Sequence, residues 1–215
     1  NLMTKNIIYF GSPSFSADIL EAILKFKIEN LKFRVVAAVT SPDRPTGRHQ
    51  ELAPSPVAQL ASEYDLPVFK PEKLDEANLS HLKLLKPDFF LVVSYGKIIP
   101  DSYLSAAKTL NIHFSLLPKY RGALCIQEVL KNGDAETGVT LMEMESKLDT
   151  GPIIAQERVK IDLDDNVASL TNRLTISTIS LLKSTICNLK SEIISTPQDS
   201  SLATSPVNAH HSGDN

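Results

Sequence analysis

The chain has 215 residues, of which 42% are hydrophobic and 22% charged, and this balance is typical of a globular protein with one substantial core. Its 22 Lys and Arg residues against 25 Asp and Glu residues give a net charge of -3, so composition does not indicate a nucleic-acid-binding protein. The two cysteines, Cys125 and Cys187, lack ligand spacing, which argues against a disulfide framework and a structural zinc site. No apolar run approaches the roughly 18 residues of a membrane span, and we expect a cytoplasmic protein.

Short apolar runs alternate with helical patterns along the first half of the chain. The runs predict strands at residues 6–10, 33–39, 67–69 and 89–93, and the helical patterns lie at residues 19–24, from residue 57, and at 74–85. Residues 43–56 predict a long polar loop, and connections of this length are usually functional or mobile. The run at 89–93 is continuously apolar, so we expect that strand to be buried on both faces.

In the second half, strands are predicted at residues 110–114, 138–144 and 153–159, and a long helix at 167–189. Only a short polar segment separates the last two strands, which indicates some antiparallel pairing. Ser, Thr, Pro, Asn and Asp dominate from residue 195 onward, so we expect a domain at residues 3–195 and a linker-like tail at 196–215. The whole pattern predicts an α/β fold with an open, mainly parallel, Rossmann-like sheet flanked by helices, in which ligands bind at the carboxyl ends of the strands.

The turn after the first predicted strand does not match the usual dinucleotide-binding motif. Pro13 and Phe15 stand where the motif Gly-x-Gly-x-x-Gly needs glycine for close approach to a pyrophosphate. The chain also lacks the motif Gly-x-x-x-x-Gly-Lys of phosphate-binding loops. We therefore expect a ligand of another class at this sheet.

Asn111 and His113 lie at the end of the strand predicted at residues 110–114. Side chains alternate along a strand, so both point to one face and can enter a ligand site together. Such a pair suits acyl transfer to an amine, because a tetrahedral intermediate needs a donor for its oxyanion and a group that moves protons near neutral pH. The alternative is a core histidine bonded to a neighbouring amide, and the residues alone leave it open.

Asp149 lies in the turn Leu148-Asp149-Thr150-Gly151 between two predicted strands. An acidic residue in such a place is often only a turn former. A carboxylate that reaches the His113 imidazole would stabilise its charged form and hold the ring in position. We expect Asp149 to share one cleft with His113, within about 8 Å, so that at most one water separates them.

The segment Asn-Ile-His-Phe-Ser-Leu-Leu-Pro at residues 111–118, followed by Arg121-Gly122, resembles the motif of enzymes that transfer the formyl group of 10-formyltetrahydrofolate to an amine. Further segments are similar to the methionyl-tRNA formyltransferases within that superfamily, at residues 7–12, 41–56, 94–100, 126–127 and 132–140. The similarity runs from about residue 6 to residue 203 without a large gap. Several motifs in the same order make chance agreement very small.

The resemblance implies roles for individual residues. Asn111, His113 and Asp149 match the catalytic trio of the family. Arg48 falls where the tRNA-directed enzymes place a basic residue near the acceptor end. The formyl donor would be 10-formyltetrahydrofolate, and no metal is implied. The residues that match segments beside the folate are Ser94, Tyr95, Gly96, Ile98, Pro100, Ser115, Leu116, Leu117, Pro118, Glu143 and Leu148.

The implied reaction is formyl transfer to the free α-amino group of initiator methionyl-tRNA. The small C-terminal β-barrel domain of the family is not found in this chain, and Gln50 and Glu51 stand where lysines are usual, so we expect weak tRNA binding. No membrane and no stable protein partner are implied. The pair Lys119-Tyr120 is similar to the residues at this position in relatives that formylate amino sugars. A formyltransferase that acts on a nucleotide-linked amino sugar therefore stays an alternative. A second alternative is a folate-binding or tRNA-binding module without catalysis.

Overall fold

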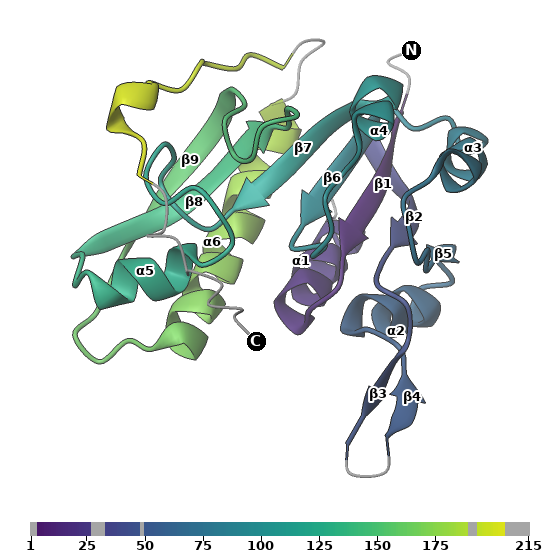
Figure 1. Ribbon diagram of the computed structural model, residues 1–215, viewed down its shortest axis with the longest axis horizontal. Helices are drawn as coiled ribbons and strands as arrows, with labels where there is room; N and C mark the ends of the chain where they lie inside the picture. Colours follow the sequence, from purple (N-terminus) through teal and green to yellow (C-terminus); the bar gives the residue numbers. More distant parts are fainter. Residues whose placement is uncertain (1–3, 27–32, 48–49, 189–192, 205–215) are drawn as a thin grey trace, which may run out of the picture.

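The computed structural model describes residues 4–26, 33–47, 50–188 and 193–204 (Figure 1). Its centre is a seven-stranded sheet with the order β5-β2-β1-β6-β7-β8-β9. In chain order, these strands are β1 (Lys5–Gly11), β2 (Phe33–Val39), β5 (Val68–Phe69), β6 (Phe89–Val93), β7 (Lys108–His113), β8 (Glu136–Glu143) and β9 (Ile153–Lys160). The pairs from β5 to β7 are parallel, whereas β7–β8 and β8–β9 are antiparallel. The predicted α/β class and the antiparallel pairing in the second half are confirmed.

Helices cover both faces of the sheet. One face packs against α1 (Ser14–Leu24), α2 (Pro56–Glu63), α5 (Cys125–Lys131) and α6 (Val167–Asn188), and the other against α3 (Glu76–Lys83) and α4 (Asp101–Ala106). Along β1 the side chains alternate between the two cores, because Ile7 and Tyr9 face the first set of helices and Ile8 and Phe10 face the second. None of the helices within the described ranges is long and apolar enough to cross a membrane.

The long polar loop expected at residues 43–56 contains a small antiparallel hairpin of β3 (Arg44–Thr46) and β4 (Glu51–Ala53). The hairpin follows β2 and projects away from the sheet (Figure 1). It ends where Ser55 caps α2, since Ser55 Oγ accepts a hydrogen bond from Ala58 N at 3.1 Å. The sequence pattern also missed α4 and α5, because helices of six and seven residues show too little periodicity to be recognised.

Residues 193–204, after α6, lie against the domain. Thr196 and Ile153 exchange two main-chain hydrogen bonds of 2.7 Å, and Arg121 N donates to Thr204 O at 2.9 Å. Between these contacts, Asp199 caps a single 3-10 turn at Ser200–Leu202. The described part of the linker-like tail is therefore hydrogen-bonded to the domain, and we refer to residues 193–204 as the C-terminal segment.

Candidate active site

β7 carries Asn111 and His113 on the same face, because the alternating residues Leu110 and Ile112 point into the core beneath α1 and α6. The two polar residues lie opposite Met142 and Thr140 of β8. Parallel pairing changes to antiparallel pairing at β7, so the site lies at the carboxyl end of the last parallel strand. In open α/β sheets, ligands commonly bind at the carboxyl ends of the parallel strands.

The His113 ring makes a hydrogen bond at one nitrogen and faces a carboxylate at the other. Nε2 lies 2.8 Å from Tyr120 O, and Nδ1 lies 3.7 Å from Asp149 Oδ2. A carbonyl oxygen can only accept, so Nε2 carries the hydrogen and Nδ1 is the basic nitrogen of the neutral ring. His113 and Asp149 are 7% and 9% exposed, which strengthens the attraction between a protonated ring and the carboxylate. The separation is longer than a hydrogen bond but well within the 8 Å expected from the sequence.

The turn between β8 and β9 brings Asp149 to His113. Glu143, at the end of β8, pairs with Leu110, so the turn folds back along β7 to place Asp149 beside its last residue. Asp149 has a positive φ of 53° and accepts a hydrogen bond from Gly122 N at 2.8 Å. A Cβ added at Gly151 would overlap the Glu143 carbonyl oxygen, so only glycine fits the return of this turn.

A buried hydrogen-bond network fixes the loop after β7. Thr140 Oγ1 donates to Ser115 O at 2.7 Å and accepts from Leu117 N at 3.2 Å. Gln156 Nε2 donates to Thr140 Oγ1 at 2.8 Å and to Leu117 O at 2.9 Å. Neither Thr140 nor Gln156 was predicted from the sequence as a site residue. The alternation of β8 offered a signal for Thr140, since its buried neighbours on both sides are apolar and point to the opposite face.

Asn111 has an unengaged side chain. Its amide makes no hydrogen bond to any residue that the structure describes, so it is available to a ligand. The N–H groups of residues 95–98, after β6, likewise donate to no atom in the described part of the chain. A polar ligand at this end of the sheet would therefore find donors from a side chain and from the main chain.

Exposed apolar side chains border the same place. Ile98 is 90% exposed and Leu148 is 70% exposed, and they lie on the segments after β6 and β8. Ser146 Oγ donates to Asp101 Oδ1 at 2.6 Å, which ties these two segments together. Unpaired main-chain donors beside exposed aliphatic side chains fit a planar heteroaromatic group such as the pterin of the expected formyl donor.

The remaining residues expected beside the folate lie on three segments. The segment between β6 and α4 contains Ser94, Tyr95, Gly96 and Pro100, and Ser94 has a positive φ of 52°. The segment after β7 contains Ser115 to Pro118. Glu143 ends β8 and forms an ion pair with Lys108 at 2.9 Å. Arg48 lies outside the described residues. No group of three potential metal ligands occurs among the residues that the structure describes.

Burial raises the pKa of two groups near the site. The pKa of the Tyr95 hydroxyl rises to about 12, and its oxygen has no hydrogen-bond partner among the described residues. Burial also raises the pKa of the Cys125 thiol to about 11, with a smaller contribution from the negative charge of Asp149. Both groups therefore stay protonated at neutral pH.

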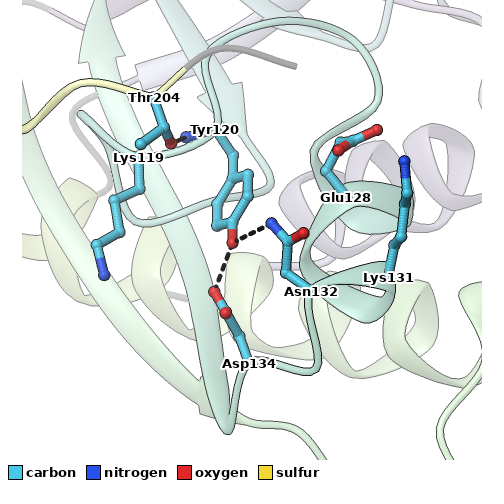
Figure 2. A pocket seen from close by; sticks show the side chains of 7 residues that line it. All are labelled: Lys119, Tyr120, Glu128, Lys131, Asn132, Asp134 and Thr204. Carbon is cyan, nitrogen blue, oxygen red and sulfur yellow. Dashed lines mark hydrogen bonds between the residues drawn. The ribbon is translucent and has the colours of Figure 1, made fainter. Parts of the chain in front are cut away.

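A pocket of about 280 Å³ lies beside the Tyr120 side chain, and His113 does not line it (Figure 2). Tyr120 Oη donates to Asp134 at 2.7 Å and accepts from Asn132 Nδ2 at 2.9 Å. The pocket contains none of the predicted catalytic or folate residues; it is lined by Lys119, Tyr120, Glu128, Lys131, Asn132, Asp134 and Thr204. The Tyr120 side chain is therefore held by Asp134 and Asn132, while the Tyr120 carbonyl oxygen contacts His113.

Sequence relatives share most of the chain. A methionyl-tRNA formyltransferase of Staphylococcus epidermidis is 40% identical over 202 residues, covering 92% of this chain and 63% of the relative. One of Staphylococcus aureus is 41% identical over 206 residues, covering 94% of this chain and 64% of the relative. The chain thus spans less than two thirds of the length of these relatives.

Solved structures with the same fold are also formyltransferases. The phosphoribosylglycinamide formyltransferase of Bacillus halodurans superposes with a TM-score of 0.74 at 26% identity, covering 87% of this chain and 97% of the other. A sugar 3N-formyl transferase, solved in the presence of dTDP and 5-N-formyl-THF, gives 0.64 at 25% identity and covers 97% and 72%. A family model described as Formyl transferase matches residues 5–186. The chain belongs to the formyl transferase family.

Proposed function

We propose that this chain transfers the formyl group of 10-formyltetrahydrofolate to the free α-amino group of initiator methionyl-tRNA. The observation that carries the chemistry is the unengaged Asn111 amide beside the His113–Asp149 pair, at the carboxyl end of β7. The acceptor is supported by relatives that are 40% and 41% identical and carry the name methionyl-tRNA formyltransferase. A protein that acts on this acceptor would work in the cytoplasm.

The three polar side chains would divide the chemistry between them. A bound formyl donor supplies an acyl carbon to the acceptor amine. Asn111 Nδ2 donates to the oxygen on which negative charge develops, and the protonated His113 ring adds positive charge beside it. The acceptor amine forms its bond to the formyl carbon as that carbon's bond to N10 of the folate breaks. The proton that the amine loses passes through His113 Nδ1 to N10, because Nε2 is engaged with Tyr120 O. Asp149 stabilises the charged ring and accepts a hydrogen bond from a water that carries the proton.

The segments around the trio would hold the folate. Residues 94–100 supply unpaired main-chain N–H groups, and Ile98 and Leu148 supply apolar contact surface. Residues 115–118 lie in the loop that Thr140 fixes. The hairpin of β3 and β4 would reach the acceptor, with Arg48 near the tRNA phosphates, and its Gln50 and Glu51 keep that interaction weak.

A nucleotide-linked amino sugar is the second candidate acceptor. The similarity to the sugar 3N-formyl transferase, with a TM-score of 0.64, favours it. Its identity of 25% is well below the 40% shared with the tRNA-directed relative, so methionyl-tRNA remains the first choice.

The test is formyl transfer by the full chain from 10-formyltetrahydrofolate to methionyl-tRNA, a dTDP-linked amino sugar and phosphoribosylglycinamide. We expect turnover with methionyl-tRNA that is lost in a His113→Ala variant. Turnover only with the amino sugar would replace the proposed acceptor and keep the chemistry. Binding of a folate analogue without transfer to any acceptor would instead show a module without catalysis.

A further inference from the structure

Gln198, in the C-terminal segment, hydrogen-bonds to both loops that hold the His113–Asp149 pair. Its Nε2 donates to the carbonyl oxygens of Asp149 and Gly151 at 2.9 and 2.8 Å. Its Oε1 accepts from Arg121 Nη2 at 2.9 Å and from Arg121 Nε at 3.3 Å. One side chain thus joins the loop after β7 to the turn after β8.

The chemistry of these contacts selects an amide. Two carbonyl oxygens require a donor, whereas the Arg121 guanidinium requires an acceptor, so one orientation of the Gln198 side chain satisfies all of them. A carboxylate at this position could not donate to the carbonyls. A lysine could not accept from the guanidinium.

Arg121 lies between the two main-chain groups that contact the pair. Tyr120 O accepts from His113 Nε2 at 2.8 Å, and Gly122 N donates to Asp149 Oδ2 at 2.8 Å. Gln198 holds the Arg121 guanidinium, and Thr204 O, in the same C-terminal segment, accepts from Arg121 N at 2.9 Å, so the segment restrains both contacts. By holding the Asp149 carbonyl as well, Gln198 restrains the carboxylate from its own main chain.

Backbone conformation shows why such restraint is needed. Tyr120 and Asp149 have φ values of 57° and 53°, in the left-handed region that residues other than glycine seldom adopt. Such conformations persist where surrounding contacts hold them. The C-terminal segment holds Tyr120 a second time, because Tyr120 N donates to Thr204 Oγ1 at 2.8 Å.

We infer that Gln198 is a positioning residue of the active site, and that the C-terminal segment sets the geometry of the His113–Asp149 pair through Arg121 and the Asp149 turn. Its effect on turnover rests on the proposed function. Its effect on the His113 ring follows from the geometry alone, so the two can be tested apart.

The kinetic test compares Gln198→Ala and Gln198→Glu with the wild-type full chain. We expect kcat to fall about 10-fold or more in both, with KM for donor and acceptor changed less than about twofold, since misplacement of reacting groups chiefly slows the chemical step. Leu202→Ala is the matched control in the same segment, because its side chain is 61% exposed, and it should keep wild-type kcat. Wild-type kcat in Gln198→Ala would overturn the inference.

Combination with His113→Ala separates positioning from general stabilisation. If Gln198 acts through His113, adding Gln198→Ala to the His113→Ala variant should change the residual rate less than about twofold. An equal, additive loss in both backgrounds would show a merely structural role and overturn the inference.

An NMR measurement gives a readout without turnover. The His113 Nε2 proton, bonded to Tyr120 O, should give an imidazole signal that is absent in His113→Ala and exchanges slowly in the wild type and in Leu202→Ala. In Gln198→Ala we expect faster exchange or loss of this signal. An unchanged signal would overturn the inference, even if the wild type formylates no acceptor and the proposed function fails.

Discussion

Two segments that follow parallel strands of the same sheet are built in opposite ways. The loop after β7 is held by buried hydrogen bonds from Thr140 and Gln156 and by contacts from the C-terminal segment. The hairpin after β2 is exposed along β3 and nearly all of β4. Its strands bond mainly to each other, and at its base Asp43 pairs with Lys70 at 2.6 Å.

The difference reflects two tasks. Proton transfer and oxyanion stabilisation depend on positions within about 0.5 Å, so the groups around His113 need rigid support. A segment that contacts a large acceptor from outside can be exposed, because charge attraction acts over about 8 Å at physiological salt. We therefore expect substitutions in the loop after β7 and in its supporting residues to alter catalysis and stability. Substitutions in the hairpin of β3 and β4 should alter only acceptor binding.

The largest effect on turnover is expected from removal of the two polar side chains of β7, Asn111 and His113. Asn111→Ala and His113→Ala should each lower kcat about 100-fold or more, because each removes a group that stabilises charge or moves a proton. Steady-state formyl transfer measures this, and thermal unfolding checks that the fold is kept. His81→Ala, on the exposed surface of α3, is the matched histidine control and should keep full activity. An unaltered rate in either β7 variant would remove that residue from the mechanism.

A smaller effect is expected when the support of the loop is broken. Thr140→Val keeps the size of the side chain but leaves Ser115 O and Leu117 N without their buried partner, so the free energy of unfolding should fall by about 1–3 kcal/mol. Urea denaturation measures this change. Thr46→Val removes a long, exposed hydrogen bond to Glu51 O in the hairpin and should change stability by less than about 0.5 kcal/mol. Equal losses in both variants would contradict the contrast between the segments.

A substitution in the hairpin should change the affinity for the acceptor and nothing else. Arg48→Ala is expected to weaken tRNA binding and to lower the slope of log Kd against log salt by about 0.9, as for one lost phosphate contact on a duplex. The affinity for a folate analogue should not change. Titrations with tRNA at two salt concentrations measure this, and Arg34→Ala, at the amino end of β2, is the control. A weaker affinity for the folate analogue in Arg48→Ala would show that the hairpin also supports the folate site.

The Cys125 thiol, next to the loop after β7, tests the rigidity of that loop without any measurement of catalysis. Burial raises the pKa of Cys125 to about 11, so only about a thousandth of the thiol is ionised at pH 8, compared with about a tenth or more in the unfolded chain. In a Cys187→Ser background, iodoacetamide should label the native protein roughly 100-fold more slowly than the urea-unfolded protein. Labelling of the native protein should speed up as the pH rises toward about 11. Rapid labelling at pH 8 would show that this region opens.

Local patterns were sufficient for most of the sheet. The apolar runs of β1, β2 and β6 predicted the strands because burial on both faces leaves few polar positions in them. The hairpin and the short α4 and α5 were missed, since three to seven residues carry little periodicity. The catalytic and folate assignments came from alternation and family resemblance, and they stay predictions until the variants are measured.

The sequence by itself determined the class of fold, the shared face of Asn111 and His113, and the family. Only the tertiary structure decided which groups hold these side chains. Tyr120 O selects the protonated nitrogen of His113, and Gln198 reaches Arg121 across 77 positions of the chain from a segment that reads as a linker. Hydrogen bonds between residues so far apart leave no periodic trace in the sequence, because they depend on where the folded chain brings two polar groups within about 3 Å.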